Sequence, residues 1–321
     1  MSYSARIFLI GVLVACAPSS AFAGFFKSVL FGDQVSHLQD EDREILLTRE
    51  KGVSAAELGV AQFIDVQNFD NYLVGTFKLE SYGIAGTTPL TNLPTPDGEN
   101  ITGVFVTKIV TEQILPSNPF VPPGGKDYTH FYGLAPAEED VWDWLGLSRN
   151  DLGTMVSFWE NLSGGEPEIF DADGVSLSPV KASLQSAERD NLVLEVGFTG
   201  TDPLTGKPAA GANEFWSAQS TSADTLAVSA NDVLFSAALG LTFNPNPLVI
   251  FTPHDHLGFG AETIAQLSGR VKEPASLDKS LPVNTDTDFF IRGQVVPEPG
   301  TLAIWGLFAV LGIGSVHKLR D

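Results

Sequence analysis

Two histidines one residue apart are the sharpest candidate for chemistry in this chain. They are His254 and His256. In an extended segment, residues two apart point to the same side, so both imidazoles could bind one metal ion. A complete site needs a third ligand, from another histidine or a carboxylate. Pro253 and Gly258 bracket the motif and favour a solvated surface turn instead.

A second candidate metal site is the acidic segment that begins at Asp171. Asp171 and Asp173, followed by Gly174, are similar to the opening of a calcium loop, where alternate oxygens surround a hard cation. An EF-hand would need a carboxylate at its twelfth position, where Ala182 stands, so the EF-hand is excluded. A looser calcium site remains an alternative to a plain β-turn. We therefore expect no cofactor, with calcium at this segment as the alternative.

A cluster of carboxylates and tryptophans offers a third kind of chemistry. The paired acids of glycoside hydrolysis could come from Glu138, Glu139, Asp140 and Asp143. A platform for stacking on a sugar ring could come from Trp142, Trp144, Trp159 and Trp216. A solvated helix face and an ordinary core residue explain the same pattern. The cluster therefore supports only an alternative function, a secreted carbohydrate-binding module or a glycoside hydrolase.

The last 25 residues, 297–321, combine three parts in a fixed order. The tripeptide Pro297-Glu298-Pro299 comes first. Its prolines fix φ and donate no backbone hydrogen bond, which favours an extended, accessible segment. Residues 301–316 carry no charge and predict a single transmembrane helix, somewhat shorter than the ~20 residues of an ordinary span. Lys318 and Arg320 follow and favour a cytoplasmic end.

This arrangement resembles the PEP-CTERM sorting signal of Gram-negative bacteria. The resemblance covers residues 296–321 and implies recognition of Pro297, Glu298 and Pro299 by an exosortase, a membrane sorting enzyme. It also implies an intermediate in the inner membrane, then delivery to the cell surface or the extracellular matrix, often in association with exopolysaccharide. A plain C-terminal membrane anchor is the alternative.

The first 23 residues predict a signal peptide, and therefore Sec export and signal peptidase as partners. An apolar run, 7–15, follows Arg6, and the small residues Ala21 and Ala23 suit cleavage before residue 24. Cys16 also fits a lipoprotein box, which would make it a lipidated first residue. If cleavage follows Ala23, the only cysteine of the chain is removed, and no disulfide supports the mature protein.

Between these signals, residues 24–296 predict an exported acidic domain that is mainly β. The chain has a formal net charge of −21, which excludes nucleic acid as a partner. Its 31 glycines, 20 prolines and 22 phenylalanines suit many strands joined by tight turns. We expect an antiparallel β-sandwich or a barrel-like domain, with one or two short helices near the N-terminus and in mid-chain. A split near 116–126 is the alternative to one domain.

The spacing of hydrophobic residues predicts the secondary-structure elements. Alternation over 75–81, 192–198 and 289–295 predicts strands with one face inward. Helical spacing of apolar residues predicts a helix over 37–59, interrupted at Gly52, and a second short helix over 137–147.

Together these features predict an exported structural or adhesive protein that is not an enzyme. The alternatives are the carbohydrate-directed protein above and a metal-dependent enzyme that uses His254 and His256.

Overall fold

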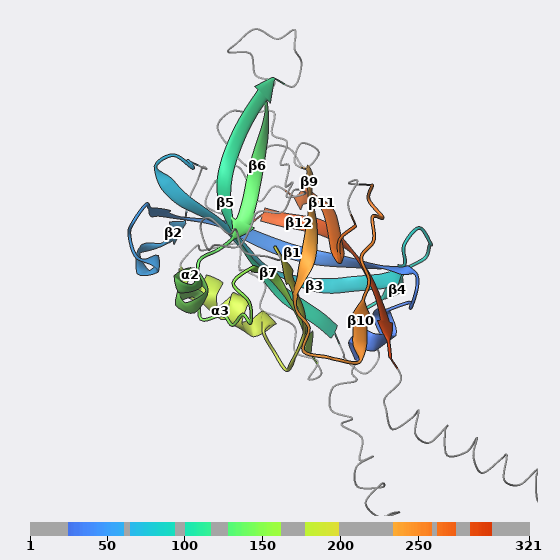
Figure 1. Ribbon diagram of the computed structural model, residues 1–321. Coiled ribbons are helices and arrows are strands. Elements are labelled where there is room, and N and C mark those ends of the chain that lie inside the picture. The colour runs from blue at the N-terminus through green and yellow to red at the C-terminus, as the bar shows by residue number, and fades with distance from the viewer. Residues whose placement is uncertain are drawn as a thin grey trace, which may run out of the picture.

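The chain folds into a closed, eight-stranded antiparallel β-barrel (Figure 1). The computed structural model describes residues 25–60, 65–93, 100–116, 128–161, 177–198, 234–258, 262–273 and 283–296. The strands of the barrel, in spatial order, are β1 (Val35–Glu50), β3 (Phe69–Ile84), β5 (Asn100–Pro116), β7 (Thr154–Asn161), β8 (Asn191–Gly197), β9 (Leu234–Phe243), β11 (Ala265–Glu273) and β12 (Val283–Val295).

Shorter elements extend the barrel or pack against it. Four strands extend its sheet, and two single-turn 3₁₀ helices and two α-helices pack against it. These are β2 (Gly59–Val60), β4 (Thr91–Asn92), β6 (Tyr128–Pro136), β10 (Val249–Phe251), η2 (Phe25–Val29), η3 (Ala55–Glu57), α2 (Glu139–Leu145) and α3 (Leu177–Ala187). The strands on either side of residues 117–127, β5 and β6, pair with each other, so both belong to one sheet.

The barrel closes where its first strand meets its last. β1 pairs antiparallel with β12 from Val35 opposite Arg292 to Glu44 opposite Val283. On its other side, β1 pairs with β3, and that ladder has a β-bulge between Gln39 and Asp40. The fully buried Asp40 carboxylate accepts a hydrogen bond of 3.0 Å from the backbone N–H of Thr287 on β12. A side chain thus satisfies a buried backbone donor at the closing seam.

Aromatic rings fill the barrel interior. The centroids of Phe77, Phe158 and Phe289 lie 5.0, 5.1 and 5.2 Å apart, with two of the three contacts edge-to-face. Gly103 on β5 lies opposite both Phe77 and Phe158. A Cβ atom at this position would come within 2.2 Å of the Phe77 ring, so glycine leaves the space that the ring occupies. The three rings are therefore the centre of the main core.

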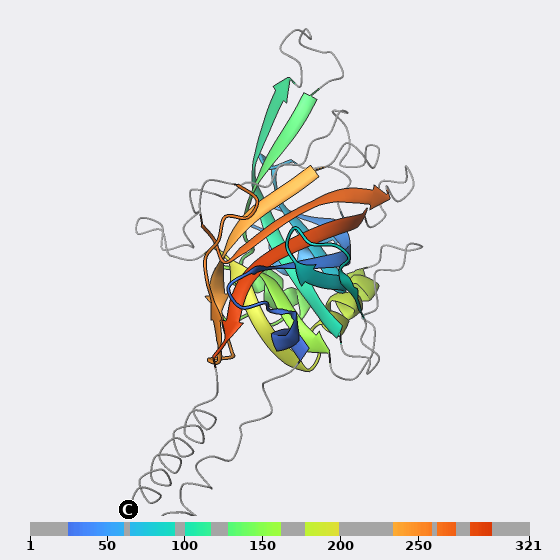
Figure 2. The ribbon, with the colours of Figure 1, turned by 90° about the vertical axis from the view of Figure 1, so that its right-hand side faces the viewer.

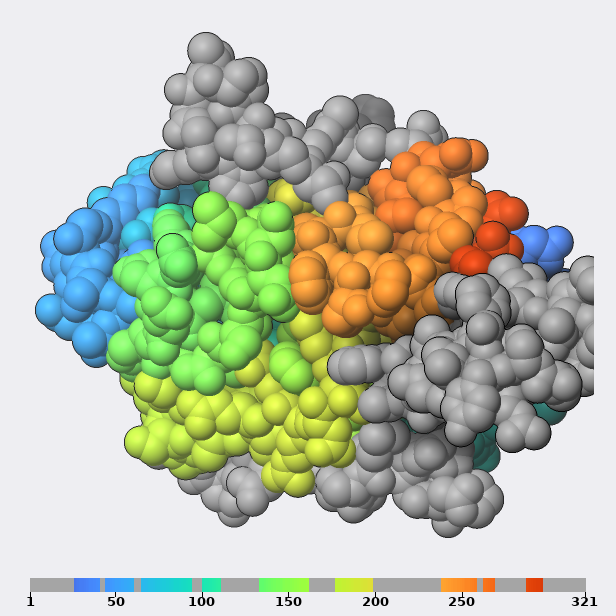
Figure 3. Space-filling model, turned by 60° about the horizontal axis from the view of Figure 1, so that its bottom comes forward, coloured from blue at the N-terminus to red at the C-terminus, as the bar shows by residue number. Residues whose placement is uncertain are grey.

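A second core lies on the outer face of the barrel. The outward side chains of β3 and β5, such as Tyr72 and Val104, are covered by Trp142 of α2 and Leu184 of α3. The Gln185 side chain of α3 donates to the carbonyl of Leu145, the last residue of α2. Figure 3 shows the two helices as adjoining green and yellow-green surfaces. β3 and β5 are thus buried on both faces.

Both ends of the barrel's chain emerge at the same end of the molecule (Figure 2). Phe26 of η2 lies beside Phe251 of β10, with ring centroids 6.5 Å apart. β10 in turn pairs with the last residues of β12, Val249 opposite Val295. The first and last described elements, η2 and the end of β12, therefore lie at one end of the barrel.

The prediction of a mainly β, barrel-like domain with a short helix in mid-chain is confirmed, but the predicted helix near the N-terminus is wrong. Residues 35–50 form β1, not the first part of a helix over 37–59. Ile45 and Leu47 face the outer core while Leu46 faces the interior, so this strand is apolar on both faces. Because both faces are apolar, the alternation typical of a strand is missing. The spacing of the apolar residues then resembles that of a helix.

Candidate functional site

Several predicted site residues lie outside the described residues. They are the cleavage residues Ala21 and Ala23, the calcium candidates Asp171 and Asp173, and the sorting tripeptide Pro297, Glu298 and Pro299. In the ranges that the structure describes, no helix has the length and apolar character that crossing a membrane requires. The predicted C-terminal helix, 301–316, also falls outside these ranges.

The two histidines of the predicted metal pair have different surroundings. His254 is buried, and its Nε2 lies 3.0 Å from the carbonyl oxygen of Phe290, to which it donates. Its Nδ1 faces the backbone N–H of His256 at 3.4 Å. Burial lowers the pKa of His254, so its ring is neutral at pH 7. Both ring nitrogens of His254 thus face protein groups, whereas His256 is exposed.

A third histidine lies close to this pair through an aromatic contact. Phe290 stacks on His37 at 4.8 Å and contacts His256 at 4.7 Å between ring centroids. His37 is itself bonded to Asp288, with 2.7 Å between Nε2 and Oδ1. The strand pairing therefore gathers three of the chain's five histidines around one phenylalanine. Among the described residues, however, no three potential ligands converge on one point, and the metal site stays a prediction.

The acidic residues ahead of α2 form ion pairs instead of facing each other across a cleft. Arg49 of β1 is almost fully buried, and its Nη1 lies 2.7 Å from Oδ2 of Asp140. It also approaches Glu138 at 3.7 Å and Asp70 at 3.5 Å. Burial works to lower the pKa of Arg49, but the hydrogen bond to Asp140 and the nearby carboxylates outweigh it. Arg49 therefore remains charged.

Lys108 of β5 completes this network. Its Nζ lies 2.9 Å from Oδ1 of Asp70 and forms a very short hydrogen bond with Glu138. The hydroxyl of Tyr72 donates to the other oxygen of Glu138 at 2.9 Å. Burial is the largest single influence and raises the pKa of Glu138, but the hydrogen bond and charge of Lys108, together with the bond from Tyr72, outweigh it, and the pKa is lowered. The network attaches the start of α2 to the barrel. Glu138 and Asp140 both form ion pairs with structural partners.

The tryptophans beside these acids do not form a flat binding platform. Trp142 is fully buried in the outer core, and Trp144 is half-buried beneath Lys181, whose Nζ lies 4.5 Å above its ring. Trp144 nevertheless packs, partly buried, against the same core as Trp142. Gly146 ends α2 in a left-handed conformation with φ of 75°, which glycine adopts without strain.

Two carboxylates, the buried Glu195 and the half-buried Glu188, hold the loop between α2 and β7, and neither was predicted. Glu195 is fully buried and accepts bonds from the backbone N–H of Asn150 at 3.0 Å and from Thr154 at 3.1 Å. Glu188 accepts a bond of 3.1 Å from the backbone N–H of Ser148. Burial raises the pKa of Glu188 to about 7, and the bond from Ser148 opposes the shift.

We expect Glu188→Gln to stabilise the protein at pH 8 and to have little effect at pH 5. Between its ordinary pKa of 4.5 and about 7, Glu188 holds a proton in the folded protein that the unfolded chain has lost. Wild-type stability therefore falls as the pH rises through this window. Glutamine keeps an oxygen for Ser148 without the buried charge. We expect a gain of roughly 1–3 kcal/mol at pH 8, since partial exposure of Glu188 screens the shift.

Urea unfolding of both proteins at several pH values measures this effect. Glu57→Gln, at an exposed carboxylate of η3, is the matched control and should leave the pH dependence unchanged. Parallel stability curves for the wild type and Glu188→Gln from pH 5 to pH 8 would contradict the expectation.

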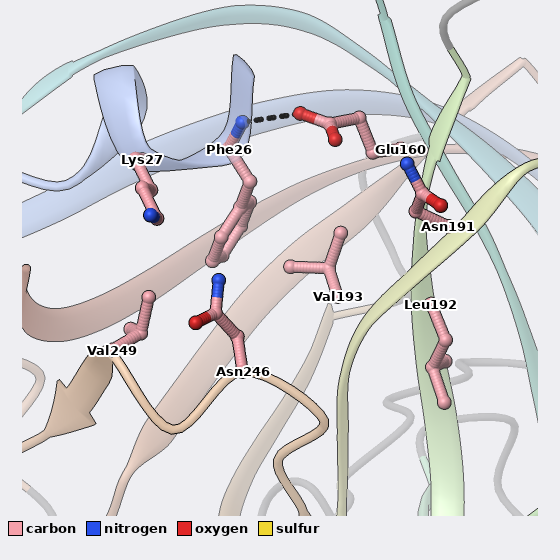
Figure 4. A pocket seen from close by; sticks show the side chains of 8 residues that line it. All are labelled: Phe26, Lys27, Glu160, Asn191, Leu192, Val193, Asn246 and Val249. Atoms are coloured by element: carbon pink, nitrogen blue, oxygen red, sulfur yellow. Dashed lines mark hydrogen bonds between the residues drawn. The ribbon is translucent and has the colours of Figure 1, made fainter. Parts of the chain in front are cut away.

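The barrel end that carries both chain ends is the best candidate for a functional site. Here Phe26, Lys27, Glu160 and Val249 line a cavity of about 30 Å³, room for one or two water molecules (Figure 4). The buried carboxylate of Glu160 accepts a bond of 2.7 Å from the backbone N–H of Phe26. The cavity is too small for a sugar or a nucleotide. This end of the barrel is therefore of interest because η2 and the end of β12 meet there, not because it contains a ligand pocket.

A rigid turn precedes β10 at this end. The Asn246 carbonyl accepts from Val249 at 3.0 Å, and the Asn246 side chain accepts from Leu248 at 3.0 Å. The Asn244 side chain donates to the carbonyl of Val249 at 2.8 Å. Asparagines of this kind close turns with their own side chains. The turn presents the carbonyl of Leu248 to Val296, whose N–H lies 2.7 Å away.

Comparison with protein-family models, with curated proteins and with solved structures finds no match to this chain. The functional argument therefore depends on the residues themselves.

Proposed function

We propose that this chain is an exported structural or adhesive protein of the cell surface or extracellular matrix, without enzymatic activity. A signal peptide directs it through Sec and signal peptidase. An exosortase-type enzyme then reads Pro297, Glu298 and Pro299 while the apolar run 301–316 lies in the inner membrane. The observation that carries this proposal is the order of tripeptide, uncharged run and basic residues at 297–321.

The geometry of the barrel supports this division of the chain. Val296 is bound to Leu248 by a backbone hydrogen bond, and the tripeptide begins with the next residue. The proposed sorting signal thus begins directly after a residue that is hydrogen-bonded to the barrel. The filled aromatic interior and the ion-paired acids beside α2 also favour a non-enzymatic role. Exopolysaccharide is the proposed neighbour, because the resemblance of residues 296–321 to the PEP-CTERM signal implies it.

Replacing all three residues of the tripeptide with alanine should abolish processing. We expect the wild-type protein to appear at the cell surface or in the medium without its C-terminal segment. The variant Pro297→Ala, Glu298→Ala, Pro299→Ala should instead accumulate in the membrane fraction with its C-terminus intact, because the recognition element is gone. Intact-mass measurement of each fraction reports both ends of the chain and any lipid on Cys16.

The matched control is Pro253→Ala, which removes an exposed proline outside the tripeptide and should be processed normally. A wild-type protein that keeps its full C-terminus in the membrane would identify a plain anchor and contradict the proposal.

A further inference from the structure

We propose that β10 is a clamp that regulates processing at the tripeptide, an inference that rests on the proposed function. The clamp consists of β10 and the turn before it, residues 244–251, paired with residues 293–296 of the chain. While it is closed, the last residues before Pro297 belong to the folded barrel. Processing requires the clamp to open.

The clamp is anchored in the core at the barrel end. Val249 and Phe251 are both buried. A Cβ atom on Gly293 would lie 3.2 Å from the ring of Phe251 and 3.3 Å from Leu30, so the backbone of β12 runs directly beneath these side chains. The ladder continues with Thr252 donating to Arg292 at 2.8 Å and Val296 donating to Leu248 at 2.7 Å. Residues 292–296 are thus held along their whole length.

The distance to the membrane makes this restraint important. Only four residues, 297–300, separate Val296 from the uncharged run. Fully extended, they span at most roughly 14 Å, which brings the end of the barrel close to the membrane surface. An enzyme that binds an extended peptide engages its backbone over several residues. Release of residues 293–296 doubles the free length to roughly 28 Å and gives an enzyme room to bind.

The hydrogen-bond pattern shows where the clamp can be locked. Since residues 248 and 296 form a hydrogen-bonded pair, Val249 and Val295 form the next, non-bonded pair, in which the side chains are closest. Such a pair suits a disulfide. The only native cysteine, Cys16, lies in the predicted signal peptide and does not compete in the mature domain.

The same pattern shows where the clamp can be opened. Ile250 and Gln294 form the following hydrogen-bonded pair, so the N–H of Ile250 points toward β12. Ile250→Pro removes this donor, while the exposed side chain, at 49% of its full accessibility, contributes little to the core. Ile250→Ala is the matched control, because it removes the same side chain and keeps the donor.

The test follows C-terminal processing of the full-length precursor in membranes of the source bacterium. We expect Ile250→Pro to be processed about fivefold faster than Ile250→Ala, the change expected from one lost hydrogen bond. The double variant Val249→Cys/Val295→Cys should stay unprocessed when oxidised and recover wild-type processing when a reductant is added. The single variant Val295→Cys should not respond to the reductant.

The outcomes separate this inference from the proposed function. An oxidised double variant processed as fast as the wild type, or equal rates for Ile250→Pro and Ile250→Ala, would overturn the clamp while leaving the sorting signal intact. Should Ile250→Pro fail to fold, the disulfide and its reversal still decide the question. A wild-type precursor that is never processed at the tripeptide would overturn both.

Discussion

Phe158→Ala should lower the free energy of unfolding by about 3–5 kcal/mol, the range for losing a fully buried phenylalanine. Its ring is completely buried and touches both Phe77 and Phe289 edge-to-face. Alanine removes these contacts and leaves a cavity in the barrel interior, because the surrounding strands are fixed by ladders on both sides. Urea unfolding followed by tryptophan fluorescence measures the loss.

A cavity can be distinguished from general misfolding. The slope of unfolding against urea should stay unchanged, and benzene should restore part of the stability of Phe158→Ala by filling the space. Phe31→Ala, at a half-buried ring beside Tyr82, is the control and should cost much less. A loss below about 1 kcal/mol at Phe158 would show that the interior is not close-packed.

Arg49→Met is expected to lower the free energy of unfolding by roughly 3 kcal/mol. The substitution removes the positive charge that lies between Asp140, Glu138 and Asp70 and leaves Lys108 as its remaining cation. Removing one partner of a buried ion pair costs about 3–5 kcal/mol, and the partly exposed side chains of Glu138 and Asp140 reduce this value. Methionine keeps most of the apolar stem, so the measurement reports the charge.

The control for Arg49→Met is Lys181→Met, which removes a cation that lies over Trp144 near the surface. We expect a loss below about 1 kcal/mol there. A double-mutant cycle with Asp140→Asn should give a coupling energy for the pair of at least about 0.5 kcal/mol. Additive losses at Arg49 and Asp140 would contradict the network.

The strands that alternate were predictable, and those buried on both faces were not. Phe289 and Ile291 point inward while Phe290 points outward, as the period of two indicates. Residues 35–50 gave no such signal, because two cores contact the same strand. The helix α3 was not predicted, although Pro179 lies in its first turn, where proline is tolerated. Its buried residues, Val180, Ser183, Leu184 and Ala187, do follow helical spacing.

The candidate sites, too, were only partly predictable from the sequence. Sequence spacing made His254 and His256 a pair, but only the fold brings His37 to Phe290, across 253 positions of the chain. Glu188 and Glu195 carry no local motif. Their role depends on backbone N–H groups of a loop some 40 positions away, which no local pattern reveals. The proposed sorting signal at the C-terminus is different, because its three parts are contiguous and can be identified from the sequence alone.

The seam between β1 and β12 determines when the protein can complete its structure. Its partners, such as His37 and Asp288, are separated by 251 positions, so the first strand must wait for the last. Contacts of such long range slow folding and lengthen the time for which strand edges are available to other chains. A chain that emerges gradually from a ribosome or a translocation channel cannot close the barrel until β12 has emerged. Chaperones that bind unfolded polypeptides should therefore meet this protein before it matures, and their abundance should influence its yield.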